Sequence, residues 1–375
     1  MNSFSTTGEK TGKPGSLTEM AARIAEPEFA ELRAFYRMRR TESLRMVLDE
    51  AGWADASAAF GAVRDAVETQ SVVFVQSIHL GHEAALNPLR ARRSGAPARL
   101  DAAELVDREL AEKGCRWCDP KGWHVSQGSR FAEEFGTVSS PDGRFRGIPN
   151  WARLAPISGL VYGDERAHNL FRLTESDFVA MFETALSYAT SARAQRPEAR
   201  YIVGFLNGGA KSAGSVSHAH LQVVGRDDRH FGIAEQVVAC CPPDYWQRLA
   251  GIQDSLGLVT HSGSSIAWAN LCPVKERDVT ILSPDLMSGA RFVYGLLQAL
   301  IRSGTNSFSL AAILRPEASQ DPRFASWPAV VWRFVDRGDM RAAHADIGSL
   351  ELLGGTSAIA TDPWVVAGWL GQDRF

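Results

Sequence analysis

The apolar and polar positions at the start of the chain follow a helical pattern. Residues 20–70 are dominated by Ala, Glu, Arg and Leu, and Phe29, Leu32, Phe35 and Tyr36 recur at helical spacing. Apolar residues three or four positions apart lie on one face of a helix. The pattern therefore predicts a helical N-terminal region.

The segments before and after this region have different residue patterns. Residues 1–19 are polar and rich in Gly, Ser and Thr, which predicts a disordered tail. Residues 70–76 (QSVVFVQ) predict a short buried strand. A basic connector punctuated by Pro and Gly spans residues 86–100, and residues 101–113 predict a helix that ends at Gly114.

The middle of the chain predicts one α+β unit. Residues 144–163 indicate two strands broken by prolines, and Thr174 caps a helix whose apolar residues recur at i, i+3, i+4, i+7 and i+8. Residues 201–207 form a strand that leads into the glycine-rich turn 208–215. Residues 218–224 then alternate as a strand, with His218, His220 and Gln222 on one face.

The second half of the chain repeats this order weakly. Strand, helix, strand and strand are predicted at residues 265–282, 286–301, 308–314 and 328–335. A pseudo-repeat of roughly 150 residues follows from this order. The fold class is therefore α+β, with two similar halves. The predicted division is a tail (1–19), a helical N-terminal extension with its connector (20–109), a catalytic half with a metal site (110–255) and a degenerate second half (256–375).

Composition narrows the function classes. The 375 residues are 45% hydrophobic and 22% charged, and the formal net charge is −3. This balance predicts no extended basic face, so nucleic acid is not the expected partner, although a few positive groups can still hold a small anion. No apolar run approaches the roughly 18 residues needed to span a bilayer, so no membrane partner is expected. We expect a cytoplasmic protein.

Cysteine usage fits a reducing compartment. The five cysteines are odd in number, and only Cys115 and Cys118 form a spaced motif. In such a compartment CxxC indicates metal or redox chemistry more than a structural disulfide.

The strongest motif surrounds the second histidine of a short HxH pair. The segment reads FLNGG (205–209), then AGS (213–215), then HAHLQ (218–222). This order resembles the active-site signature of the histidine-triad superfamily. It is similar to the branch that contains galactose-1-phosphate uridylyltransferase and the dinucleoside polyphosphate phosphorylases. The resemblance covers residues 110–225 by motif and residues 260–370 only by general layout.

The resemblance implies covalent catalysis at His220. This imidazole would attack the α-phosphorus of a nucleotide and hold the nucleoside monophosphate, which splits one difficult transfer into two easier ones. The backbone carbonyl of Ala219 is expected to hold the ring in the reactive tautomer. Gln222 and Ser215 would donate hydrogen bonds to the phosphate oxygens.

Three further residues are implied as substrate contacts. The glycine turn, which includes Gly214, would let backbone N–H groups approach the phosphates closely. Asn207 lies directly before that turn, and Asn150 resembles the family's asparagine that contacts the nucleotide. Pocket shape around Asn150 would set the choice of base, which the sequence leaves open.

The resemblance also implies a metal site. Cys115, Cys118 and His168 fall where the uridylyltransferases keep metal ligands, and His218 completes a Cys2His2 set. Such a set suits tetrahedral zinc and also fits Fe²⁺. With four protein ligands the site is closed, so its expected role is structural, bracing the start of the catalytic strand.

The second half departs from the family pattern. Where the uridylyltransferases carry a His-Trp-His pair, the nearest match here is Ser326-Trp327-Pro328, so no second metal is expected. Glu351 lies in a segment that resembles the one whose glutamate contacts the sugar, although an ordinary solvated acid on a strand fits equally well. The acceptor therefore need not be galactose 1-phosphate.

These residues predict a nucleotidyltransferase that moves an NMP group from a nucleotide or nucleotide-sugar donor to a phosphorylated acceptor. Gln222 in place of a third histidine favours transfer over hydrolysis by family analogy. One alternative is a phosphorylase of diadenosine polyphosphates or nucleotide sugars, which Leu221 in His-x-His-Leu-Gln favours. Another is a nucleotide-binding module without turnover. The N-terminal region either covers the active site or builds a homodimer interface, and the sequence leaves both open.

Overall fold

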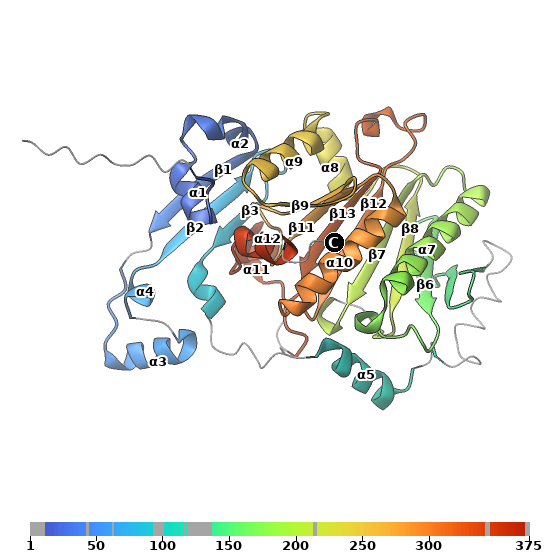
Figure 1. Cartoon of the computed structure of the whole chain (residues 1–375), viewed down its shortest axis with the longest axis horizontal. Coiled ribbons are helices and arrows are strands. Elements are labelled where there is room, and N and C mark those ends of the chain that lie inside the picture. The colour runs from blue at the N-terminus through green and yellow to red at the C-terminus, as the bar shows by residue number, and fades with distance from the viewer. Residues whose placement is uncertain are drawn as a thin grey trace, which may run out of the picture.

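The computed structural model describes residues 12–42, 45–61, 64–92, 101–115, 117–118, 137–212, 216–341 and 346–371. Within these ranges the chain forms an α+β fold around two β-sheets (Figure 1). Among the described helices, none combines the length and the apolar character that crossing a membrane requires.

The larger sheet has ten described strands in the order β4–β5–β6–β8–β7–β12–β13–β11–β10–β9, and every neighbouring pair is antiparallel. The strands are β4 (Val138–Ser139), β5 (Phe145–Pro149), β6 (Ile157–Gly163), β7 (Tyr201–Gly208), β8 (His220–Arg226), β9 (Val259–Ser262), β10 (Ser265–Ala269), β11 (Val279–Ser283), β12 (Phe308–Leu314) and β13 (Val330–Asp336). Two long helices, α7 (Glu175–Gln195) and α10 (Leu286–Arg302), lie side by side on one face of this sheet (Figure 1). The main apolar core fills the space between them and the sheet.

The strand order reveals the internal repeat that the sequence predicts. Read outward from the central β7–β12 pair, β8, β6 and β5 on one side match β13, β11 and β10 on the other. The loops that follow β5 and β10 each contain an equivalent backbone hydrogen bond. The N–H of Asn150 donates to the carbonyl of Ser158 (2.8 Å), and the N–H of Asn270 donates to the carbonyl of Asp278 (2.9 Å). The two halves therefore have the same topology.

This match identifies β13 as the counterpart of β8. Leu160, two residues after Ser158, pairs with Gln222, and Thr280, two residues after Asp278, pairs with Arg333. Arg333 thus holds the position of Gln222 in the second half. Its guanidinium pairs with the fully buried carboxylate of Asp278 (2.9 Å).

The sequence pattern matched the second half's counterpart of the HxH pair to Ser326-Trp327-Pro328. The structure places that counterpart three residues later in the chain. Stepping back along β13 from Arg333 gives Val331 as the counterpart of His220 and Ala329 as the counterpart of His218. Neither of these residues is a histidine, so this strand offers no imidazole ligand for a second metal.

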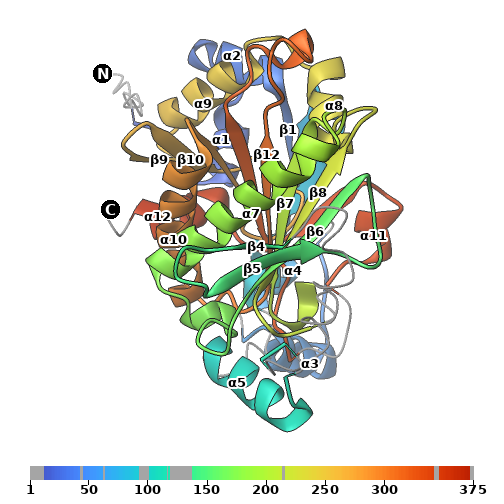
Figure 2. The ribbon, with the colours of Figure 1, turned by 90° about the vertical axis from the view of Figure 1, so that its right-hand side faces the viewer.

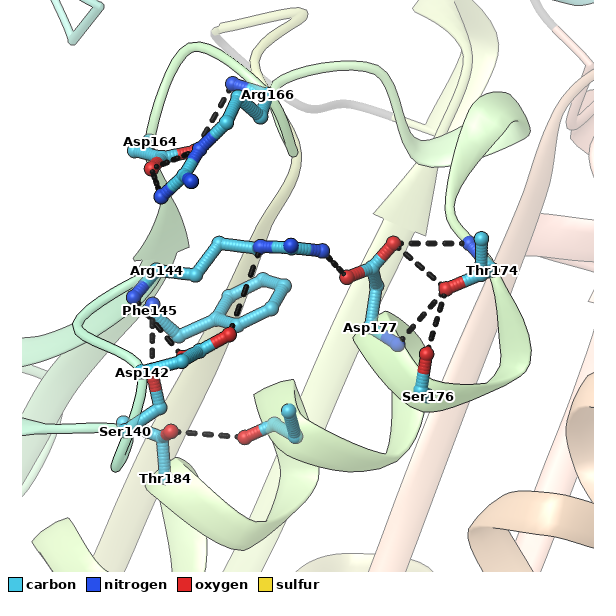
Figure 3. A network of polar contacts seen from close by, with 11 residues as sticks. Ser140, Asp142, Arg144, Phe145, Asp164, Arg166, Thr174, Ser176, Asp177 and Thr184 are labelled. Atoms are coloured by element: carbon cyan, nitrogen blue, oxygen red, sulfur yellow. Dashed lines mark hydrogen bonds and ion pairs between the residues drawn. The ribbon is translucent and has the colours of Figure 1, made fainter.

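Helix α7 is anchored at its beginning by a polar network (Figure 3). Thr174 and Asp177 form a reciprocal capping box, which satisfies backbone N–H groups that the first turn leaves unpaired. Arg144, which lies just before β5, pairs with the same Asp177 carboxylate and also approaches Asp142. The network ties the turn between β4 and β5 to the helix that supports the sheet.

The remaining described α-helices are α1 (Leu17–Arg23), α2 (Ala30–Phe35), α3 (Glu50–Phe60), α4 (Arg64–Glu68), α5 (Ala102–Lys113), α8 (Gly232–Cys240), α9 (Tyr245–Ser255), α11 (Ser349–Leu352) and α12 (Pro363–Gly371). Figure 2 shows α3 and α5 at one end of the molecule and α2, α8 and α9 at the other.

The prediction of a helical segment over residues 20–70 was wrong in its centre. Tyr36–Glu42 is a strand, β1, because it pairs along its whole length with β2 (Ser71–Ser77). The small sheet continues through β3 (Glu83–Leu86) to β14 (Thr356–Ile359), which runs parallel to β3. Pairing with a partner strand outweighs local helix propensity in this segment.

The predicted tail also ends earlier than residue 19. Leu17 begins helix α1 and is buried, with Ser16 as its N-cap. Residues 1–11 lie outside the described residues. The N-terminal segment packs its apolar side chains against the second half of the large sheet, on the face opposite α10. This second core includes Phe35, Val75 and Val331.

Candidate functional site

The antiparallel pair β7 and β8 brings the motif residues together. Leu206 lies opposite Leu221, and both point into the core beneath the helices. Continuing this register by one residue places Asn207 beside His220 on the other face of the sheet. The turn after β7 needs glycine at position 209, where φ is +76° and an added Cβ would lie 2.4 Å from the Asn306 carbonyl oxygen.

His220 begins β8, and the residue is 6% exposed. The ring Nδ1 lies 2.8 Å from the carbonyl oxygen of His218. Burial lowers the pKa of His220, whereas the hydrogen bond to His218 acts in the opposite direction. The neutral ring therefore donates from Nδ1, which leaves the lone pair on Nε2.

The expectation that the Ala219 carbonyl fixes this tautomer was wrong by one residue. Ala219 instead donates its backbone N–H to the carbonyl of His168 (2.6 Å). The strand begins only at His220, so the backbone still turns at residues 218 and 219, and the His218 carbonyl can reach the ring.

A tryptophan that the sequence motifs did not single out packs against His220. The Trp117 ring centroid lies 5.2 Å from that of His220, 5.6 Å from that of His218 and 5.2 Å from that of Tyr162. Trp117 is buried, and its contact with His220 is edge-to-face. Its position between the two cysteines of the CxxC motif is the sequence feature that could have indicated its place beside this site.

Three of the four predicted metal ligands form a cluster. The ligand atoms of Cys115, Cys118 and His218 all lie within 4.8 Å of one another and could hold a metal ion. The His218 Nδ1 is 3.1 Å from the Cys115 sulfur and 3.5 Å from the Cys118 sulfur. Tetrahedral zinc imposes about 3.5 Å between sulfur and nitrogen ligands, so the separations suit this metal.

The fourth predicted ligand lies at the edge of this cluster. The His168 Nδ1 is 3.6 Å from the Cys118 sulfur, and its Nε2 is 3.9 Å from an Asp107 carboxylate oxygen on α5. Burial and the neighbouring Cys115 raise the pKa of Cys118 to about 12. A divalent cation would offset that unfavourable environment for a thiolate.

The second nitrogen of His218 is also engaged. Its Nε2 donates to the carbonyl oxygen of Gly163, at the end of β6 (2.8 Å). A backbone acceptor on the far side of a ligating imidazole fixes the ring orientation and leaves Nδ1 as the metal-facing atom. The donor set of Cys115, Cys118 and His218 therefore fits a metal ion, and His168 lies beside it.

The predicted nucleotide contacts lie along the same face. Gln222 is half-buried and lies opposite Leu160. Asn150 is also half-buried and directly follows β5, and its side-chain oxygen accepts from the N–H of Ala152 (3.2 Å). Trp151 beside it is 45% exposed.

Two further predicted contacts, Gly214 and Ser215, lie outside the described residues. Glu351 is on helix α11, not on a strand. Its carboxylate pairs with the Lys275 ammonium at 2.8 Å, and both side chains are largely buried. Glu351 is therefore an ion-paired group in the second half and not a solvated acid.

Comparison with known proteins identifies the fold. No family model matches the sequence, and no curated protein matches it significantly. An ADP-glucose phosphorylase from Arabidopsis thaliana, solved with bound ADP-glucose, matches with a TM-score of 0.53 and 14% identity over 78% of this chain and 96% of that one. A uridylyltransferase matches with a TM-score of 0.48 and 13% identity, covering 60% and 83% of the two chains. The yeast Ap4A phosphorylase in complex with Ap4A has a TM-score of 0.38 and 14% identity, covering 88% and 99%.

The chain thus has an α+β fold. More particularly, this fold is similar to that of the ADP-glucose phosphorylase.

Proposed function

We propose that the protein is a nucleotidyltransferase that moves an NMP group between a nucleotide donor and a phosphorylated acceptor through a covalent nucleotidyl-histidine. One observation carries this proposal: the Nδ1 of the buried His220 ring lies 2.8 Å from the His218 carbonyl oxygen, which selects the tautomer with its lone pair on Nε2. Burial lowers the pKa of His220, which favours the neutral form of this ring at neutral pH.

The chemistry takes two balanced steps. In the first, the His220 Nε2 lone pair forms a bond to the α-phosphorus, and the bond from that phosphorus to the bridging oxygen breaks. The leaving group departs with its phosphate, and the positive charge on the ring is stabilised by the Nδ1–H donated to the His218 carbonyl. In the second step a phosphate oxygen of the acceptor attacks the same phosphorus, and the P–N bond breaks to restore His220.

The side chains beside His220 would bind the transferred phosphoryl group. Gln222 lies two residues along the same strand, and Asn207 lies on the neighbouring strand. Amide N–H groups aimed at phosphate oxygens stabilise the charge that develops there. The cluster of Cys115, Cys118 and His218, with His168, would hold zinc or Fe²⁺ and brace the residues before β8.

A phosphorylase is the second candidate, with inorganic phosphate as the acceptor for the same intermediate. The residue between His220 and Gln222 favours it, because Leu221 resembles the phosphorylases at a position where the uridylyltransferases usually carry glycine. The ADP-glucose bound in a structure of the same fold makes nucleotide sugars the first donors to test.

Trapping of the intermediate tests the proposal. The wild-type protein is incubated with α-³²P-labelled ADP-glucose, UDP-glucose, ATP and Ap4A, quenched, and examined for an acid-labile, alkali-stable label on His220. Label that a sugar phosphate discharges supports the transferase, and label that only inorganic phosphate discharges supports the phosphorylase. If no donor labels His220, the protein is a binding module and the proposal fails.

A further inference from the structure

A polar relay connects the second half of the fold to the catalytic half. Asn207 on β7 lies opposite Ser309 on β12, at the junction of the two halves. The Ser309 hydroxyl donates to the Asn207 side-chain oxygen (3.0 Å). The Arg337 guanidinium, just beyond β13, donates to the same Ser309 oxygen (3.1 Å).

The direction of this relay follows from the chemistry of arginine. A guanidinium carries only donors, so the Ser309 oxygen must accept from Arg337. The hydroxyl hydrogen of Ser309 is then available to donate to Asn207, which must present its oxygen. The Asn207 Nδ2 group is consequently turned away from Ser309, and β7 lies between the strand of Ser309 and the strand of His220. Arg337 thereby determines which end of the Asn207 amide faces Ser309 and which end faces away from it.

Arg337 is itself held in place. Its guanidinium forms a two-pronged ion pair with the largely buried carboxylate of Asp346. Its backbone N–H donates to the carbonyl of Ser307 (2.8 Å). A donor fixed at both backbone and side chain loses little additional entropy when it orients Ser309. The relay is therefore built into the fold before any ligand binds.

We propose that Ser309 and Arg337 are positioning residues that act through Asn207, orienting its Nδ2 to donate to the phosphoryl oxygens at His220. This inference rests on the proposed function for its activity readout. It gives the second half, which has no histidine on its equivalent strand, a part in the reaction. Neither Ser309 nor Arg337 contacts the reacting atoms; each acts by selecting one orientation of an amide.

A double-mutant cycle measures this dependence. The rate constant for labelling of His220 at low donor concentration is determined for S309A, N207A, the double variant and R337M, with R341M as the matched control. Arg341 is an arginine that pairs with Asp339 in an exposed turn. Loss of one oriented hydrogen bond should slow labelling by about tenfold in S309A and in R337M. S309A should add no more than about twofold in the N207A background, because its effect passes through Asn207.

A spectroscopic readout keeps this test independent of activity. In protein labelled with ¹⁵N-asparagine, the Asn207 side-chain NH₂ signals are identified by their loss in N207A. They should shift in S309A and in R337M and stay unchanged in R341M. Unchanged signals in S309A would overturn the relay, and so would a full additive loss of labelling in the double variant. If wild-type His220 is never labelled while the signals shift as expected, the proposed function fails and the relay stands.

Discussion

The Nδ1 atom of His220 lies 2.8 Å from the carbonyl oxygen of His218, whose own Nδ1 faces the sulfur atoms of Cys115 and Cys118. One residue thus links the candidate metal cluster to the candidate nucleophile, through its side chain on one side and its backbone on the other. Anything that displaces His218 should disturb the tautomer of His220 as well.

Replacement of His220 should remove the covalent intermediate and leave the fold intact. We expect H220N to lower the transfer rate by at least about 10³-fold, because no other group on β8 can form the P–N bond. Transfer assays and circular dichroism on H220N check this, with H261N as the control, since His261 is exposed on β9. Full activity in H220N would assign the chemistry to another residue.

Removal of one cysteine should remove the metal. We expect the wild type to purify with about one equivalent of zinc or iron and C115S to lose it, with a lower Tm, because three remaining ligands bind a structural metal far more weakly. Elemental analysis and thermal melts of both proteins measure this. C240S provides the control, because Cys240 is exposed and outside the cluster. Equal metal content in C115S and the wild type would contradict the site.

Most elements could be predicted because their signals are local. The box formed by Thr174 and Asp177 and the apolar period of α7 are contained within a few residues. Strand β1 carries no such signal. Its sequence YRMRRTE lacks clean alternation, and its extended form depends on pairing with Ser71–Ser77, where partners are 29 to 41 residues apart. The predicted domain limits at residues 109 and 255 stay predictions.

The residues of the candidate site also fall into two groups, those that the sequence predicts and those that it does not. Cys115 and Cys118 belong to one spaced motif and His218 and His220 to another, and the family resemblance, not spacing, predicts that the two motifs meet. Ser309 is 102 residues from Asn207, and no spacing rule joins them. The carbonyl that accepts from the His220 ring belongs to His218 and not to Ala219, because β8 begins only at His220. The ends of helices and strands are the part of a fold that a sequence pattern predicts least well.

Acidification should destabilise the protein partly through His230. This fully buried ring accepts from the Phe231 N–H at Nδ1 (2.8 Å), so its Nε2–H donates to the Leu314 carbonyl (3.0 Å). Burial lowers the pKa of His230 below the ordinary value of a histidine. The unfolded chain therefore takes up a proton first, and stability falls as the pH drops below about 6.5, by up to about 1.4 kcal/mol per pH unit.

Denaturant unfolding at pH 7.5 and 5.5 measures this contribution. We expect the wild type to lose more unfolding free energy between these two values than H230Q, whatever the absolute stability of the variant. The exposed His261 again provides the control, and H261Q should keep the pH dependence of the wild type. Equal pH dependence in H230Q and the wild type would show that His230 is not the titrating group.

Gly159 on β6 should tolerate no side chain, because the strand passes directly over the fully buried Tyr188 ring of α7. A Cβ at this position would lie 2.1 Å from the Tyr188 Cε1 atom, so either the ring or the strand must move. We expect G159A to lower the free energy of unfolding by about 2 kcal/mol or more.

G251A is the matched control: Gly251 lies on an exposed part of α9 with no atom within 4 Å of the added Cβ. Alanine there should be neutral or stabilising by up to about 1 kcal/mol. Denaturant unfolding of both variants decides the matter, and a G159A protein as stable as G251A would mean that α7 does not pack against β6 in this way.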